Sequence, residues 1–315
     1  MFPVYICGIA RGLLSPSLPF LFRHQRRKAL KEADLIVLGG VPLDFRLNYG
    51  FGIPSKTPLI NINRDRLLLR LNRRPSEAIH GDPQKILIKI SHSFEFSNLE
   101  RESWHTDLQK REQQREDEIK RGQEEKTENV NPLFLFSRIN EGLEDNSLLI
   151  ADGGDFAATA SYTLQPRSPL TWLDPGPFGN LGVGGGFAMG AKCAKPRSDI
   201  WLLYGDGAAG FSLFEFDTFV RHELPVIAVV GNDAGWTQIL RDQLEWLGDD
   251  TGCRLRHTAY HEVARGFGAE GLFIEKNEQV DAVLKKALNI SRKGKPDLIN
   301  AILSPSEFRK GSLSI

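Results

Sequence analysis

The fold of this chain is decided by two stretches, LLYGDGAAGF at residues 202–211 and PVIAVVGNDAG at residues 225–235. Each is an apolar run that ends in a tight turn with an oxygen-bearing side chain. The 24 residues between Gly207 and Asn232 suit a crossover helix, and such a helix would bring both turns to the same edge of a parallel sheet. We therefore expect Asp206 and Asn232 to meet at this edge, beside glycine-rich backbone.

The same alternation of apolar runs and helical patterns extends over residues 132–315. It is typical of an α/β fold, a doubly wound parallel sheet with helices on both faces. The predicted strands are 147–152, 170–173, 199–204, 225–231, 272–275 and 297–303, and the predicted helices are 182–194, 212–222, 235–243, 261–268 and 277–292.

Residues 1–97 read as part of a second α/β domain that precedes the first. Buried-strand runs occur at 33–39 and 56–63, and a helical pattern covers 83–90. Residues 98–131 differ sharply, because they are almost wholly polar and carry only a few apolar anchors, Trp104, Leu108 and Ile119. This charged linker is either a solvated helix or partly disordered, and we expect no chemistry in it.

The composition excludes several classes of function. Lys plus Arg and Asp plus Glu are 40 each, and this zero balance argues against a broad nucleic-acid-binding surface. No stretch approaches the roughly 20 apolar residues of a membrane span, and no signal peptide is evident, so the chain as written is expected to be soluble. Its three cysteines, Cys7, Cys193 and Cys253, show neither metal spacing nor a disulfide framework, which fits a reducing compartment.

The turn after the first stretch has the residues that an anion site needs. Gly205 and Gly207 allow a sharp turn, and Ala208 is small enough for backbone N–H groups to approach an anion. A helix starting near Phe211 would point its positive end at the site. A glycine turn around Asp206 is nevertheless common as a purely structural feature.

The second turn supplies the missing oxygen donors. The Asn232 amide oxygen, the Asp206 carboxylate and the Ala234 carbonyl would give three of the roughly six oxygens that Mg²⁺ prefers, the rest coming from phosphates and water. Asp233 is a competing ligand, and its alternative role is to cap the helix that starts near Gly235.

Two further glycine-rich segments precede these turns. Five glycines fall between Gly179 and Gly186, but Phe187 occupies the third glycine position of a G-x-G-x-x-G pattern, so no dinucleotide site is predicted. These glycines instead indicate a loop feeding a small-residue helix packed close to the sheet. The segment ADGGDF at 151–156 follows another strand, and its glycines could donate backbone N–H groups to phosphate while Asp155 caps the next helix.

Together these elements resemble the thiamine diphosphate-dependent enzymes, whose signature is GDG followed by Asn after roughly two dozen residues. The stretches ADGGDF, WLDPGPFGNLGVGGGFAMGAK, EFDTFVRHELPVIAVVGNDAGWTQI and FRKGSLSI are similar, more closely, to a lyase branch of that family. The resemblance covers nearly the whole chain. It implies that residues 1–97 are the C-terminal portion of the family's middle domain and that residues 132–315 are its diphosphate-binding domain.

The resemblance also implies roles for individual residues. Asp206, Asn232 and the Ala234 carbonyl correspond to the Mg²⁺ ligands. Leu181 corresponds to the large apolar residue that holds the cofactor in its bent shape. The other residues of the cofactor-binding stretches, mostly contacting through their backbone, are Gly154, Asp155, Gly179, Gly205, Gly207, Ala208 and Gly235.

The chemistry implied is cleavage of a carbon–carbon bond beside a carbonyl or hydroxyl, with the cofactor as electron sink. In the lyase branch the substrate would be a 2-hydroxyacyl-CoA, and the products would be formyl-CoA and an aldehyde one carbon shorter. Acetolactate synthesis is an alternative reaction, and a non-catalytic cofactor-binding subunit is an alternative function.

One departure from the family concerns catalysis. Its members have an N-terminal pyrimidine-binding domain with a glutamate that protonates the cofactor, and this chain offers no candidate for that glutamate. We therefore expect no catalytic residue in this chain and half a site, inactive in isolation. In the family the site forms between subunits, so a homo-oligomer is expected of the complete protein. The resemblance to the lyase branch also implies anchoring of the complete protein to the endoplasmic reticulum.

Overall fold

The computed structural model describes residues 2–93 and 102–310, and the chain divides into two compact units. The main segments of the first unit are Met1–Tyr5 and Phe20–Arg115, and those of the second are Ile6–Pro19 and Glu116–Leu313. This division falls inside helix α3 (Glu102–Gln123). It does not test the domain limits expected at residues 97 and 131, which stay predictions.

The first unit contains a small parallel sheet in the order β3-β4-β5. The predicted strands at 33–39 and 56–63 and the predicted helix at 83–90 are present as β3, β4 and α2. The strand β5 was not predicted, because its four residues carry too short a pattern. The elements of this unit are β1 (Val4–Tyr5), β2 (Leu21–Phe22), α1 (Arg26–Glu32), β3 (Ile36–Gly39), β4 (Leu59–Asn63), β5 (Glu77–His80) and α2 (Pro83–Ser93).

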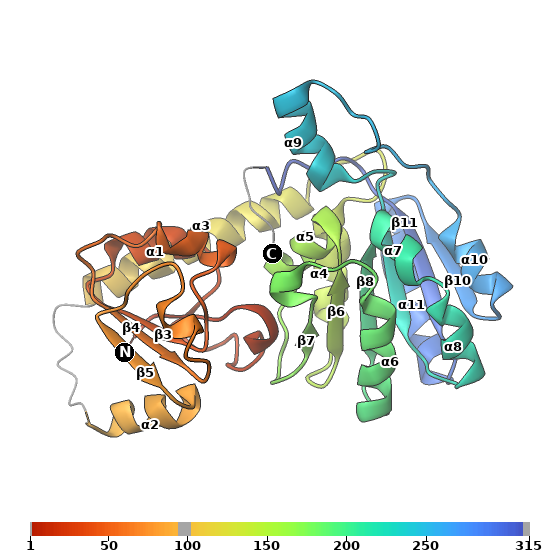
Figure 1. The fold of residues 1–315 in the computed structure, drawn as a ribbon. Coiled ribbons are helices and arrows are strands. Elements are labelled where there is room, and N and C mark those ends of the chain that lie inside the picture. The colour runs from red at the N-terminus through yellow and green to blue at the C-terminus, as the bar shows by residue number, and fades with distance from the viewer. Residues whose placement is uncertain (1, 94–101, 311–315) are drawn as a thin grey trace. The chain divides into compact units, whose positions relative to one another are not determined.

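The second unit is built on a six-stranded sheet in the order β10-β11-β9-β8-β6-β7, and every neighbouring pair is parallel (Figure 1). This confirms the predicted parallel α/β fold. All six predicted strands occur, because each is a mostly apolar run, as expected for strands that are covered on both faces. The strands are β6 (Leu148–Asp152), β7 (Trp172–Leu173), β8 (Ile200–Gly205), β9 (Ile227–Asn232), β10 (Glu270–Ile274) and β11 (Asp297–Ile302).

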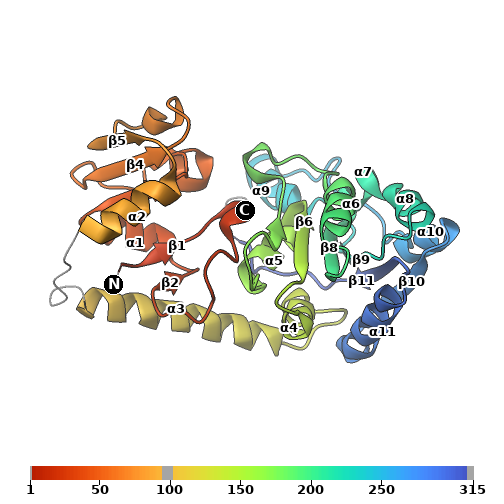
Figure 2. The same cartoon turned by 90° about the horizontal axis from the view of Figure 1, so that it is seen from below.

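Helices cover both faces of this sheet (Figures 1 and 2). Alternate strand residues point into two separate cores, so that Leu203 and Val229 lie on one face and Leu202 and Val230 on the other. Helices α4 (Pro132–Gly142), α5 (Gly154–Thr163) and α11 (Val280–Arg292) pack on the first face, and α6 (Gly184–Ala194), α7 (Asp206–Ser212), α8 (Glu215–Arg221) and α10 (Tyr260–Gly266) pack on the second.

The crossover between β8 and β9 differs from the prediction. A single helix at 212–222, starting near Phe211, was expected, but α7 begins directly at Asp206 and a short break separates it from α8. The sequence Gly-Ala-Ala-Gly suggested a turn, whereas Ala208 and Ala209 are buried against the sheet and form the helix instead. Asp206 therefore lies in the first turn of a helix.

Most of the charged linker is helical. The helix α3 covers Glu102–Gln123, which is the first of the two alternatives left open, while residues 98–101 lie outside the described part of the chain. Its apolar anchors Leu108 and Ile119 are 2% and 3% exposed, so this mostly polar helix packs against the protein at these two positions. In the described ranges 2–93 and 102–310, no helix combines the length and apolarity needed to cross a bilayer.

The absence of a side chain at Gly231 allows α5 to pack closely against β9. A Cβ atom on Gly231 would lie 2.3 Å from the ring of Phe156, so only glycine leaves room for this ring. Phe156 is 5% exposed and also stacks at 4.5 Å between ring centroids on Phe136. The start of α5 and the end of β9 are thus held together by aromatic packing.

Candidate functional site

The two predicted turns lie side by side. Strands β8 and β9 are direct neighbours, with Gly205 opposite Gly231, so Asp206 and Asn232 follow at adjacent strand ends. The carboxylate of Asp206 joins the loops: its Oδ1 accepts the N–H of Gly207 at 2.7 Å, and its Oδ2 accepts the N–H of Gly235 at 3.1 Å. Side chains and backbone from the two turns therefore form one site.

The electrostatics of Asp206 favour a cation. This carboxyl is only 2% exposed, and burial, followed by the negative charge of Asp233, raises its pKa to about 7. The N–H groups of Gly207 and Gly235 oppose this rise but do not cancel it. A divalent cation beside Asp206 would remove the cost of ionising it, so the donor set fits a hard metal ion.

Asp233 and Asp155 add further negative charge nearby. Burial raises the pKa of Asp233, and the charge of Asp155 raises it further. Capping of the following helix was predicted for both side chains, but neither α5 nor α9 has a side-chain cap. Asp233 instead accepts the hydroxyl of Thr237 at 2.6 Å, and Asp155 pairs with Arg241 on α9 (Thr237–Leu247). The arginine therefore neutralises one of the three carboxylates.

The amide of Asn232 is oriented by its neighbours. Its Nδ2 donates to the Thr258 carbonyl and to Oδ1 of Asn300, each at 3.1 Å. These two acceptors fix the flip of the amide, so that Oδ1 is the remaining acceptor atom, 3.2 Å from Nδ1 of His257. The side chain is fully buried, and its carbonyl oxygen has a second lone pair.

The third predicted ligand, the carbonyl of Ala234, already accepts one hydrogen bond. The N–H of Leu255 donates to it at 2.8 Å. Ala234 has a φ of 56°, a left-handed conformation that turns the chain sharply after Asn232. A carbonyl oxygen accepts two bonds, so a metal could share this atom with Leu255.

The predicted cofactor-binding glycines fall into two groups. A Cβ on Gly154 or Gly179 would meet no atom within 4 Å, so both face open space that a ligand could fill. A Cβ on Gly205 would lie 3.0 Å from the Gly153 carbonyl, which shows how closely the end of β8 approaches the turn after β6. Leu181 lies over these same loops, because a Cβ on Gly153 would come within 2.5 Å of its Cδ2 and 2.6 Å of Ala208.

The indole ring of Trp236 packs over Gly207. A Cβ on Gly207 would lie 2.5 Å from the indole ring, and the ring meets Phe211 edge-on at 6.4 Å between centroids. The glycine is therefore required for the tryptophan to approach the start of α7.

Three residues of this region were missed in the sequence. Asp152 ends β6 and binds the loop around Leu181, Arg241 pairs with Asp155, and Asn300 supports Asn232. Only Asp152 carried a signal, since it lies in the quoted ADGGDF segment as a charged residue at the end of an apolar strand.

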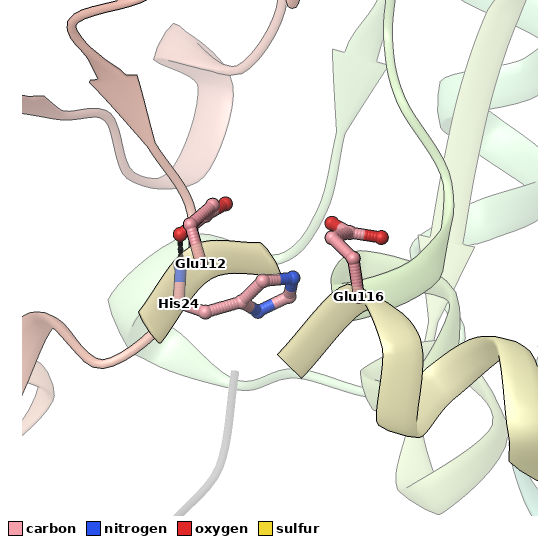
Figure 3. Close-up of side chains that lie close together, drawn as sticks. All are labelled: His24, Glu112 and Glu116. Atoms are coloured by element: carbon pink, nitrogen blue, oxygen red, sulfur yellow. Dashed lines mark hydrogen bonds between the residues drawn. The ribbon is translucent and has the colours of Figure 1, made fainter. Parts of the chain in front are cut away.

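Another polar cluster lies outside the predicted site, where His24, just before α1, meets carboxylates of α3. Figure 3 shows His24 beside Glu112, with Glu116 one turn further along the helix. The Glu112 carboxylate accepts the backbone N–H groups of Arg23 at 3.0 Å and His24 at 2.9 Å. These bonds hold the chain that leads into α1, which is a structural role.

Comparison with known proteins shows which family the sequence resembles. Residues 152–301 match the family described as "Thiamine pyrophosphate enzyme, C-terminal TPP binding domain". The chain is 44% identical over 320 residues to 2-hydroxyacyl-CoA lyase 2 of Mus musculus, covering 99% of this chain and 50% of that protein. The human protein of the same name is 43% identical over 324 residues, with the same two coverages.

A second class of relative is more distant. The acetolactate synthase large subunit of Mycobacterium tuberculosis is 33% identical over 305 residues, covering 96% of this chain and 55% of that protein. The chain thus spans about half the length of the curated relatives it matches.

Proposed function

We propose, from the match of residues 152–301 to the C-terminal TPP-binding domain of the thiamine pyrophosphate enzymes, that the site at the ends of β6, β8 and β9 holds thiamine diphosphate through a magnesium ion. The observation that supports it most is the hydrogen bond from Gly235 to Asp206, which joins the two turns around one buried carboxylate. The raised pKa of Asp206 adds the electrostatic reason for a cation.

In this proposal the metal ligands are Asp206, the Oδ1 of Asn232 and the carbonyl of Ala234. All three are oxygens, which is what Mg²⁺ prefers, and phosphate oxygens and water would complete its shell. Gly154 and Gly179 border the open space where the diphosphate would lie, and Gly207, Ala208 and Gly235 supply backbone there. Asp155 remains paired with Arg241 and shapes the rim.

The reaction we propose is carbon–carbon bond cleavage of a 2-hydroxyacyl-CoA, giving formyl-CoA and an aldehyde shortened by one carbon. When bound, thiamine diphosphate supplies an electron sink for the carbanion that such a cleavage leaves. The name shared by the relatives at 43–44% identity supports this substrate class. Acetolactate synthesis is the second candidate, supported by the relative at 33% identity.

We propose that the family's activating glutamate is supplied from outside the residues of the site described above. On this proposal the 315-residue chain binds cofactor but turns over little substrate alone. We further propose that the complete protein is a homo-oligomer. Its association with the endoplasmic reticulum, implied by the resemblance, stays a prediction that cell fractionation would check.

Calorimetric titration of the chain with thiamine diphosphate tests the cofactor assignment. Binding should require Mg²⁺ and disappear with a chelator. Asp206→Ala should weaken binding at least about a hundredfold. Mutating a residue that only hydrogen-bonds to a metal ligand already lowers metal affinity roughly 10–100-fold, and Asp206 is proposed as a ligand itself. Asp217→Ala is the matched control, since Asp217 is an exposed carboxylate paired with Arg221 on α8. Undiminished affinity in Asp206→Ala would contradict the assignment.

The substrate assignment needs a separate assay. Formyl-CoA release from a 2-hydroxyacyl-CoA and acetolactate formation from pyruvate should be compared in the complete protein. Formyl-CoA production supports the lyase, and acetolactate as the main product would replace it with the second candidate. Robust turnover by the 315-residue chain alone would refute the half-site proposal.

A further inference from the structure

A buried carboxylate beside the site has a task that the metal and the diphosphate do not explain. Asp152, the last residue of β6, is fully buried. Its Oδ1 accepts the N–H of Gly182 at 3.1 Å, and its Oδ2 accepts the N–H of Gly184 at 2.7 Å. These partners lie 30 and 32 residues further along the chain, so the bonds tie a distant loop to the end of the strand.

We propose that Asp152 is a positioning residue that holds the Leu181 turn, and through it the apolar side chain that contacts the organic part of the cofactor. This inference rests on the proposed function for the identity of the ligand. The hydrogen bonds themselves are independent of it.

Both bonds are made just after Leu181 in the chain. Gly182 follows Leu181 directly, and Gly184 begins α6, so both of the loop's anchored N–H groups lie within three residues of Leu181. The close approach requires glycine at 184, because a Cβ there would lie 2.8 Å from Oδ2 of Asp152. A carboxylate is the only side chain of this size with two acceptor oxygens for both donors.

The position of Leu181 follows from this anchoring. Its Cδ2 lies where a Cβ on Gly153 would come within 2.5 Å, so the side chain rests on the loop that follows Asp152 itself. Gly153 precedes α5 and Ala208 lies in the first turn of α7, and both segments border the proposed diphosphate. Asp152 contacts none of the proposed ligand directly and acts through Leu181.

A purely structural role for Asp152 predicts a different binding pattern. General loosening of the loops would weaken every ligand of the site to a similar degree. Loss of Leu181 placement would weaken only ligands with an organic ring system, because the diphosphate is held by backbone and metal. Thiamine diphosphate and inorganic pyrophosphate, each with Mg²⁺, therefore distinguish the two roles.

The test is calorimetric titration of the 315-residue chain with these two ligands, using Asp152→Asn, Leu181→Ala and the double variant. The asparagine keeps the size but accepts from one N–H and turns its NH₂ group toward the other. Asp297→Asn is the matched control, because Asp297 is equally buried but begins β11 at the opposite edge of the parallel sheet.

Asp152→Asn should weaken thiamine diphosphate about tenfold, the effect of losing a hydrogen bond to a charged group, and leave pyrophosphate affinity within about twofold. The double variant should be no weaker than about the more affected single variant, because both changes remove one interaction. Equal losses for both ligands, or additive losses in the double variant, would overturn the proposal. If Asp152→Asn does not fold, Gly184→Ala disturbs the same bonds and keeps the carboxylate.

A wild-type chain that binds neither ligand would refute the proposed function and not the positioning role. Hydrogen exchange then decides the latter. The amides of Gly182 and Gly184 should exchange faster in Asp152→Asn than in wild type and stay unchanged in Asp297→Asn. Unchanged exchange in Asp152→Asn would overturn the positioning role.

Discussion

Replacing Asp297 with asparagine should change how the stability of this protein depends on pH. Asp297 is fully buried at the start of β11, and among the described residues neither of its carboxylate oxygens has a hydrogen-bond partner. Burial raises its pKa well above the ordinary 3.8, and the charge of Glu270, opposite it on β10, raises it further. The folded protein therefore holds a proton here that the unfolded chain releases.

The sign follows from this difference. The stability contributed by the bound proton is fully present below the unfolded pKa near 3.8 and is lost as pH rises through the higher folded pKa. One proton difference gives a slope of about 1.4 kcal/mol per pH unit in the free energy of unfolding. Asparagine has no such proton, so the variant lacks this contribution to the slope.

Urea unfolding of wild type and Asp297→Asn, followed by far-UV circular dichroism at several pH values between about 4.5 and 8, measures the effect. The variant should gain stability relative to wild type as pH rises, by up to about 1.4 kcal/mol per pH unit. The raised carboxyls of Asp152, Asp206 and Asp233 occur in both proteins and cancel in the difference. Asp217→Asn is the exposed control. Parallel curves for wild type and Asp297→Asn would refute the reasoning.

Two substitutions at the site give further predictions. If Leu181 shapes the bound cofactor as the resemblance implies, Leu181→Ala in an active form of the protein should lower turnover more than it lowers thiamine diphosphate affinity. Steady-state kinetics beside calorimetry checks this, and an affinity loss larger than the loss in kcat would contradict it. Arg241→Ala should destabilise the protein by about 1.5–3 kcal/mol, because its guanidinium and Asp155 are only 18% and 13% exposed. Hydrogen exchange in α9 should then accelerate, Arg241→Lys should restore part of the protection, and unaltered exchange would exclude a tethering role.

The sheet was predictable because its strands are short, mostly apolar segments that stand out from the sequence around them. In the predicted strand 199–204, every residue after Asp199 is apolar or aromatic and a glycine follows, and the structure places β8 at Ile200–Gly205, one residue along. The crossover helix was less predictable, since Gly-Ala-Ala-Gly is ambiguous between a turn and a helix. Burial of Ala208 and Ala209 against the sheet decides for the helix, and burial cannot be read from local sequence.

The site divides in the same way. The spacing between Gly207 and Asn232 predicted that their turns share one sheet edge, because parallel strands leave few alternatives. The partners that orient the side chains were not predictable. Arg241 meets Asp155 across 86 residues and Asn300 meets Asn232 across 68, and nothing local marks either pair.

The ring of Phe156 wedged against bare backbone at Gly231 has a consequence for ligand capture. Because the ring contacts the backbone of β9 so closely, helix α5 cannot shift along β9 without a steric clash. The spacing between the start of α5 and the end of β9 is therefore fixed before a ligand binds. Ligand binding then costs the protein little conformational entropy, so more of the contact free energy contributes to affinity.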